Sequence, residues 1–81
     1  MKYRAERIYK DGAKNLIPQS VIEQAKDRRT YFRVVRAGFG VVDDDGNILE
    51  VYPLKRTARM AADWYNRKMA VPEEVQYVSV N

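Results

Sequence analysis

The chain has 81 residues and a net charge of +4, and it contains neither cysteine nor histidine. A chain of this length forms at most one domain, residues 1–81, with a small hydrophobic core. The missing cysteines exclude disulfides, thiolate ligands and a cysteine nucleophile, and the missing histidines remove the commonest general base and zinc ligand. There is no long apolar run and no signal-peptide pattern, so we expect a cytoplasmic protein. We also expect no metal and no cofactor.

The first third of the chain predicts a strand followed by a helix. Within residues 2–9, Tyr3, Ala5 and Tyr9 share one parity, and Asp11-Gly12 follows as a turn signal, which favours a strand over a short helix. The stretch from Ser20 to Glu23 matches a capping box, in which Ser20 begins a helix and the Glu23 carboxylate bonds back to the Ser20 amide. We therefore expect a helix near 21–29.

The middle of the chain predicts three strands, near 31–37, 39–43 and 48–52, because each is rich in β-branched and aromatic residues. Gly38 supplies a turn or bulge between the first two strands. Asp44-Asp45-Gly46-Asn47 joins the second and third as a hairpin, since Gly and Asn accept a positive φ at low cost.

Residues 54–69 give the clearest helical pattern. The alanines of its apolar stripe let the helix lie close to a sheet, and Asp63 is placed to pair with Arg59 and Arg67, four residues away on either side. A closing strand follows near 75–80. The apolar stripe consists of Leu54, Ala58, Ala61, Ala62, Tyr65 and Met69. These elements predict an α+β fold, an antiparallel sheet of three to five strands with the helices packed on one face.

Two short motifs resemble chemical sites but fail on their spacing. In a calcium loop with Gly46 at its sixth position, the first and twelfth positions are Val41 and Tyr52, which are not calcium ligands. Gly38-Phe39-Gly40 lacks the third glycine and the following helix of a dinucleotide loop. No lysine lies in an apolar stretch, and no carboxylate pair has a visible reason for a perturbed pKa. We therefore expect a non-catalytic protein.

Aromatic residues interleaved with Lys and Arg favour nucleic-acid binding, because bases stack on rings while cations meet phosphates. Residues 55–68 hold five basic residues and one acidic residue. The alternative is an ordinary solvated helix face. The candidate nucleic-acid contacts are Tyr31, Arg33, Lys55, Arg56, Arg59 and Arg67.

The order of strand, strand, Asp-Gly turn, strand and Ala-rich helix in "FRVV…GVVDDDGNILEVYPLKRTARMAADWYN" loosely resembles the three-strand-plus-helix modules of integrase arm-binding (arm-type) and AP2-like domains. The resemblance covers residues 31–68. It implies a sheet that enters the major groove of DNA and points to Tyr31 and Arg33 as contacts. The two strands after Arg36 carry no basic residue, so the resemblance concerns the fold more than DNA binding.

Residues 37–54 hold four acidic residues and no basic ones. The small size, the lack of His and Cys, and the segregated charge are similar in style to small phage or mobile-element inhibitors of host defence, such as anti-CRISPR proteins. This similarity implies a protein partner with a basic, nucleic-acid-binding surface. The candidate contacts are Asp43, Asp44, Asp45 and Glu50. The free sheet edges also make a homodimer a candidate assembly.

Overall fold

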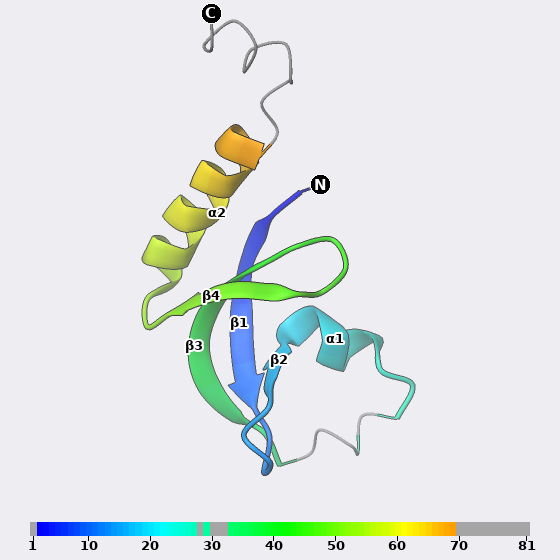
Figure 1. Ribbon diagram of the computed structural model, residues 1–81. Coiled ribbons are helices and arrows are strands. Elements are labelled where there is room, and N and C mark those ends of the chain that lie inside the picture. The colour runs from blue at the N-terminus through cyan, green and yellow to red at the C-terminus, as the bar shows by residue number, and fades with distance from the viewer. Residues whose placement is uncertain (1, 28, 30–32, 70–81) are drawn as a thin grey trace, which may run out of the picture.

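The computed structural model describes residues 2–27, 29 and 33–69 (Figure 1). These residues form an α+β fold with a curled, four-stranded antiparallel sheet and two helices, as predicted. None of the described helices is long and apolar enough to cross a membrane. The elements in chain order are β1 (Arg4–Lys10), β2 (Leu16–Pro18), α1 (Gln19–Gln24), β3 (Val35–Val42), β4 (Ile48–Tyr52) and α2 (Lys55–Met69).

The strand order is β2-β1-β3-β4, and every neighbouring pair is antiparallel. The strand predicted at 2–9 is confirmed as β1, the hairpin predicted from Asp44 to Asn47 joins β3 to β4, and the predicted helix at 54–69 is α2. The strand predicted at 75–80 lies outside the described residues. The curl of the sheet is visible in the long bend of β3 (Figure 1).

The prediction of two strands separated at Gly38 is wrong, because residues 35–42 form the single strand β3. Arg7 pairs with Phe39 and Tyr9 pairs with Arg36, so Ile8 alone lies opposite both Ala37 and Gly38. This is a β-bulge, and Gly38 has a φ of 105°. Residues 31–68 therefore contribute two described strands and a helix rather than three strands, and the strand beside β3 is β1.

The predicted capping box is not formed, and the predicted helix near 21–29 is shorter than expected. α1 begins at Gln19 and ends after Gln24, because Ala25 returns to extended backbone. The Ser20 N–H donates to Glu6 of β1 at 2.8 Å rather than to Glu23. The three-residue strand β2, which was not predicted, leads directly into this helix. A tertiary contact with β1 therefore replaces the local cap.

Both hairpins close on the same five-residue pattern, Asp-x-x-x-Asn. In one turn Asp11 Oδ1 accepts from the amides of the second and fourth following residues at 2.9 and 2.8 Å, and Asp43 does the same in the other at 2.9 and 2.9 Å. In both, the second carboxylate oxygen accepts from the side-chain amide of the asparagine, Asn15 or Asn47, at 3.2 Å. The two turns are thus built by one local device.

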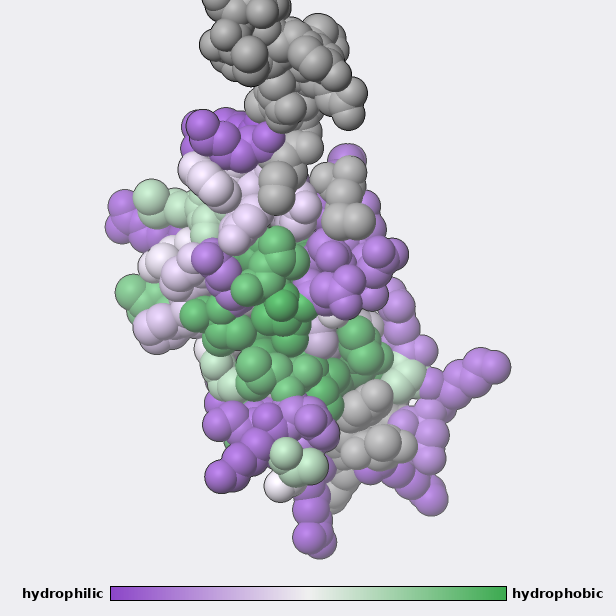
Figure 2. All heavy atoms as spheres, viewed as in Figure 1, coloured by the Kyte–Doolittle hydropathy of each residue, from purple (hydrophilic) through white to green (hydrophobic). Residues whose placement is uncertain are grey.

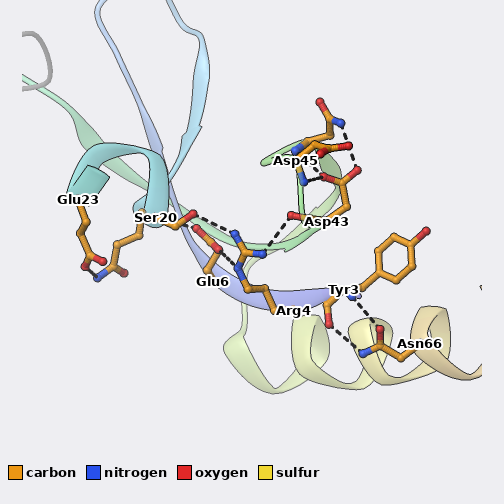
Figure 3. A network of polar contacts seen from close by, with 10 residues as sticks. Tyr3, Arg4, Glu6, Ser20, Glu23, Asp43, Asp45 and Asn66 are labelled. Carbon is orange, nitrogen blue, oxygen red and sulfur yellow. Dashed lines mark hydrogen bonds and ion pairs between the residues drawn. The ribbon is translucent and has the colours of Figure 1, made fainter. Parts of the chain in front are cut away.

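The helices lie on opposite faces of the sheet, so the prediction that both cover one face is wrong. Glu6 of β1 reaches α1, whereas its neighbour Ala5 lies beside Ala62 of α2 in a small hollow. Neighbouring residues of a strand point to opposite faces. Figure 3 shows Glu6 and Ser20 on one side of β1 and Asn66 of α2 on the other.

The core is correspondingly thin, with one small layer on each face of β1 and β3. Val41 pairs with Ala5 and faces α2, where Ala58 and Ala62 are 0% and 4% exposed. Ile8 and Val42 are fully buried on the α1 side. Complete burial of such side chains contributes roughly 1.5–3 kcal/mol each, so few residues hold the fold together.

The two outer edges of the sheet border one shallow hollow of about 610 Å³. On the face shown in Figure 2, hydrophobic side chains gather at the centre and hydrophilic side chains surround them. Leu16 of β2 and Val51 of β4 are exposed in this hollow. β2 and β4 are the outer strands of the sheet, and each has one edge that pairs with no other described strand. The homodimer expected from such free edges stays a prediction.

We expect Gly38→Ala to lower the free energy of unfolding by about 2–4 kcal/mol, through strain and overpacking together. A Cβ at this position would lie 2.6 Å from the Tyr52 carbonyl oxygen, and the φ of +105° disfavours any L side chain. Urea unfolding followed by circular dichroism measures the loss. The matched control is Gly12→Ala, where a Cβ meets nothing within 4 Å. Equal free energies of unfolding for the two variants would contradict the role given to Gly38 in the β-bulge.

Lys14 and Gly46 occupy the same place in the two turns, and both have positive φ, 67° and 86°. A residue with a Cβ is disfavoured there, so Lys14→Gly should raise the free energy of unfolding by about 1 kcal/mol. Lys14→Ala, which removes the charge but keeps the Cβ, should give no gain. A thermal melt of the three proteins checks this, and stabilisation by alanine as well would point to charge rather than backbone.

Candidate nucleic-acid interface

The outer face of α2 carries most of the cations predicted to contact nucleic acid. Because Ala58 and Ala62 face the sheet, the 3.6-residue repeat turns Arg56 and Arg67 away from it and places Arg59 at the margin of the contact, and all three are exposed. Lys55 extends the row at the first turn of the helix. From Arg56 to Arg67 the row rises about 16 Å along the helix axis. We call these four residues the α2 basic row.

The α2 basic row has no acidic partner within the described part of the chain. The predicted ion pairs of Asp63 with Arg59 and Arg67 are not formed, although the spacing allows them. By contrast, Arg4 Nε pairs with Glu6 Oε2 at 2.6 Å, and the same guanidinium donates to the Asp43 carbonyl and to Ser20 Oγ, both at 3.1 Å (Figure 3). Arg4 therefore joins β1, the β3–β4 turn and α1, whereas the cations of α2 point to solvent.

The surface around the α2 basic row is hollowed. One shallow groove of about 440 Å³ is lined by Lys55, Arg56, Arg59, Met60 and Asp63. A second hollow of about 260 Å³ shares Lys55, Arg59 and Asp63 with the first and extends to Tyr3 and β1. Two of the cations thus border both depressions.

The other two predicted contacts are not part of this surface. Tyr31 lies outside the described residues. Arg33 is exposed and precedes β3, at the end of the sheet where Val35 pairs with Lys10. The structure therefore assembles the helical candidates into one row and leaves Arg33 apart from them.

A contact that the sequence did not predict fixes the far end of α2. The side-chain amide of Asn66 accepts from the Tyr3 N–H at 2.7 Å and donates to the Tyr3 carbonyl at 2.8 Å (Figure 3). The Asn66 side chain thus provides hydrogen-bond partners for both backbone polar groups of Tyr3, as a neighbouring strand would. The only sequence signal was a polar, poorly helix-forming residue next to the aromatic Tyr65 on the core side of the helix.

The structure separates the four acidic candidates from one another. Asp43 is buried, 6% exposed, and its carboxylate closes the turn, so it is not presented to a partner. Asp44 and Asp45 are exposed at the tip of the turn, where Asp44 accepts the Lys2 N–H at 3.0 Å. Glu50 lies in β4 and accepts a hydrogen bond from the Tyr52 hydroxyl. Two carboxylates, rather than four, form the exposed acidic patch.

No family model, curated protein or solved structure matches this chain. The site therefore rests on its own geometry.

Asp43 and Asp11 should both make stability fall in acid. The hydrogen bond from the Asn47 amide, more than those from the Asn47 side chain and the Asp45 amide, holds the pKa of Asp43 below its ordinary value of 3.8, despite the opposing effect of burial. The Asn15 amide has the same effect on the pKa of Asp11. A lowered pKa in the folded state gives stability that is complete above about pH 4 and is lost as the pH falls through the folded value.

We therefore expect Asp43→Asn to reduce the difference between the urea midpoints at pH 7 and pH 3, and the double change with Asp11→Asn to reduce it further. Asp45→Asn, which removes an exposed carboxylate of the same turn, is the matched control. A pH dependence unchanged by Asp43→Asn would show that its carboxylate does not hold the turn as described.

Proposed function

We propose that this protein is a non-catalytic, cytoplasmic nucleic-acid-binding protein that contacts the phosphate backbone through the α2 basic row. The observation that carries the proposal is the outward row of Lys55, Arg56, Arg59 and Arg67, which lacks acidic partners among the described residues. Cations already held in ion pairs would have to give those up to bind. These four have no such contact to lose.

The geometry suits backbone contact better than base reading. A row rising about 16 Å spans several phosphates of one strand. The guanidinium groups can bind phosphate oxygens bidentately, and the adjoining groove gives the strand a shallow seat. Contacts of this kind carry little sequence information, so affinity should depend strongly on salt and weakly on sequence.

The second candidate is inhibition of a host defence factor by protein contact, in the manner of small phage proteins. The observation in its favour is that Asp44 and Asp45 are exposed together at the tip of a turn whose backbone is held by Asp43. A preordered pair of carboxylates can meet a basic surface with little loss of conformational entropy. It has fewer charges than the α2 basic row, and we therefore place it second.

The proposal predicts that Arg56→Gln with Arg59→Gln weakens binding to a short DNA or RNA and lowers the slope of log affinity against log salt by about 2 for duplex DNA. Fluorescence anisotropy over 50–200 mM salt measures both quantities. Lys10→Gln with Lys14→Gln removes the same charge from exposed positions distant from α2 and serves as the control. An equal loss of affinity in the two double variants would show that binding depends on net charge and not on the α2 basic row.

The same titration distinguishes nucleic-acid binding from the second candidate function, inhibition through protein contact. Asp44→Lys with Asp45→Lys should leave nucleic-acid binding intact or strengthen it, but should abolish capture of a basic protein target. Absence of any binding to nucleic acid at low salt would overturn the first proposal.

A further inference from the structure

A further pocket lies on the other flank of α2 and has the opposite chemistry. It encloses about 310 Å³ and is lined by Glu50, Tyr52, Ala61, Trp64 and Tyr65. Three of the five residues are aromatic and one is a carboxylate, and none of the described residues that line the pocket is a cation. Two strand residues and three helix residues form it, so the packing of α2 beside β4 creates the site.

The rings are arranged as walls rather than as a stack. The Trp64 and Tyr65 ring planes are 88° apart with centroids 5.0 Å from each other, so the two rings meet as a corner. Tyr3, which immediately precedes β1, packs against Tyr65 at a centroid distance of 5.3 Å. The small side chain of Ala61, one turn before Tyr65, leaves the space between the walls open. Trp64 is 48% exposed, so its ring is available to a ligand and is not held in the core.

The pocket is also electronegative. The Tyr52 hydroxyl donates to Glu50, and this hydrogen bond, followed by burial and the carboxylate charge, raises the pKa of Tyr52. Burial, followed by the Glu50 charge, raises the pKa of Tyr65. Both hydroxyls therefore remain protonated, and Glu50 is the charge of the site. The faces of the aromatic rings add negative electrostatic potential to that charge.

We propose that this pocket binds the methylated ammonium group of a ligand, with Trp64, Tyr65 and Tyr52 as walls and Glu50 as the counter-charge. Aromatic faces attract a cation within about 6 Å of the ring centroid, and rings at right angles can enclose a round head group from two sides. A pocket near 300 Å³ is at the small end of ligand sites and suits a head group rather than a whole cofactor.

The hydrogen-bonding groups of the pocket favour a methylated ammonium over an unmodified one. A lysine ammonium carries three N–H donors, and one Glu50 oxygen already accepts from Tyr52. Glu50 is the only charged acceptor in the lining and the rest is mainly aromatic rings and Ala61, so N–H donors turned toward the ring faces would lose water without a partner. Methyl groups remove the donors and keep the charge. A phosphate group that entered the pocket would meet the Glu50 carboxylate, which disfavours that use of the pocket.

The test uses choline and its neutral carbon isostere, 3,3-dimethylbutan-1-ol, as probes of the full chain. Trp64 is the only tryptophan in the sequence, so its fluorescence reports on the pocket directly. We expect saturable quenching by choline and at least about fivefold weaker binding of the neutral alcohol, since shape is kept and charge is lost. Glu50→Gln should weaken choline binding by a similar factor, whereas Asp45→Asn, a carboxylate removed elsewhere, should not. Ligand-observed NMR of the choline methyl signal repeats the measurement for Trp64→Leu, in which binding should be lost.

Circular dichroism and urea midpoints of the variants show whether each is folded. A peptide bearing trimethyllysine, compared with choline, distinguishes a protein partner from a small molecule, and tighter binding of either supports the site. Equal binding of choline and the neutral alcohol would overturn the proposal, as would equal effects of Glu50→Gln and Asp45→Asn. Saturable quenching by uridine monophosphate without quenching by choline would assign the pocket to base stacking instead.

Discussion

β1 is the strand on which the rest of the structure depends, because it is covered on both faces and paired on both edges. Its alternating side chains contact different helices: Glu6 holds the start of α1, while Ala5 makes room for α2. β2 and β3 pair with its two edges. A chain of this size cannot build a thick core on each face. On the α2 side, small residues let the helix pack close to the sheet without large side chains. On the α1 side, the hydrogen bonds and the ion pair of Arg4 add to the small apolar layer.

This arrangement decides which surfaces are left for binding. α2 lies on the sheet through Ala58 and Ala62, which use little of its circumference, so most of the helix faces solvent. One flank carries the α2 basic row. On the other flank, Trp64 and Tyr65 meet β4 and its Glu50. The same narrow contact with the sheet thus exposes cations on one side of the helix and places aromatic rings beside a carboxylate on the other.

The sequence predicted the parts of the fold that have strong local signals. The Asp-Asp-Gly-Asn hairpin and the Ala-rich helix are found where the pattern indicated. β2 was missed because three residues are too few to show a period. Gly38 was read as a break between strands because a glycine with positive φ has the same sequence signature in a turn and in a bulge. Ser20 is a normal cap residue, but Glu6, distant in sequence, took its amide.

The candidate sites show a similar limit. The helical spacing of Lys55, Arg56, Arg59 and Arg67 was sufficient to place them in one row, because a helix converts spacing into direction. Asp43 could not be distinguished from Asp44 and Asp45 in the sequence, since only the folded turn shows which carboxylate closes it. The sequence signal that singles out Asp43 is the Asp-x-x-x-Asn pattern, which is repeated at Asp11 and Asn15.

The position of Trp64 decides whether the two flanks of α2 act as one site or as two. Trp64 lies about 140° from Arg59 and about 80° from Arg56 around the helix axis, whereas Arg67, three residues further along, lies only about 60° from it. Arg59 therefore points away from the pocket, and Arg67 is the member of the α2 basic row that lies nearest to Trp64. The Glu50 charge opposes the approach of a phosphate on its own side and attracts a cation there. The opposite charges of the two flanks therefore separate the two proposed ligands, and changes at Arg56 and Arg59, on the far side of the helix from Glu50, should leave choline binding unaltered.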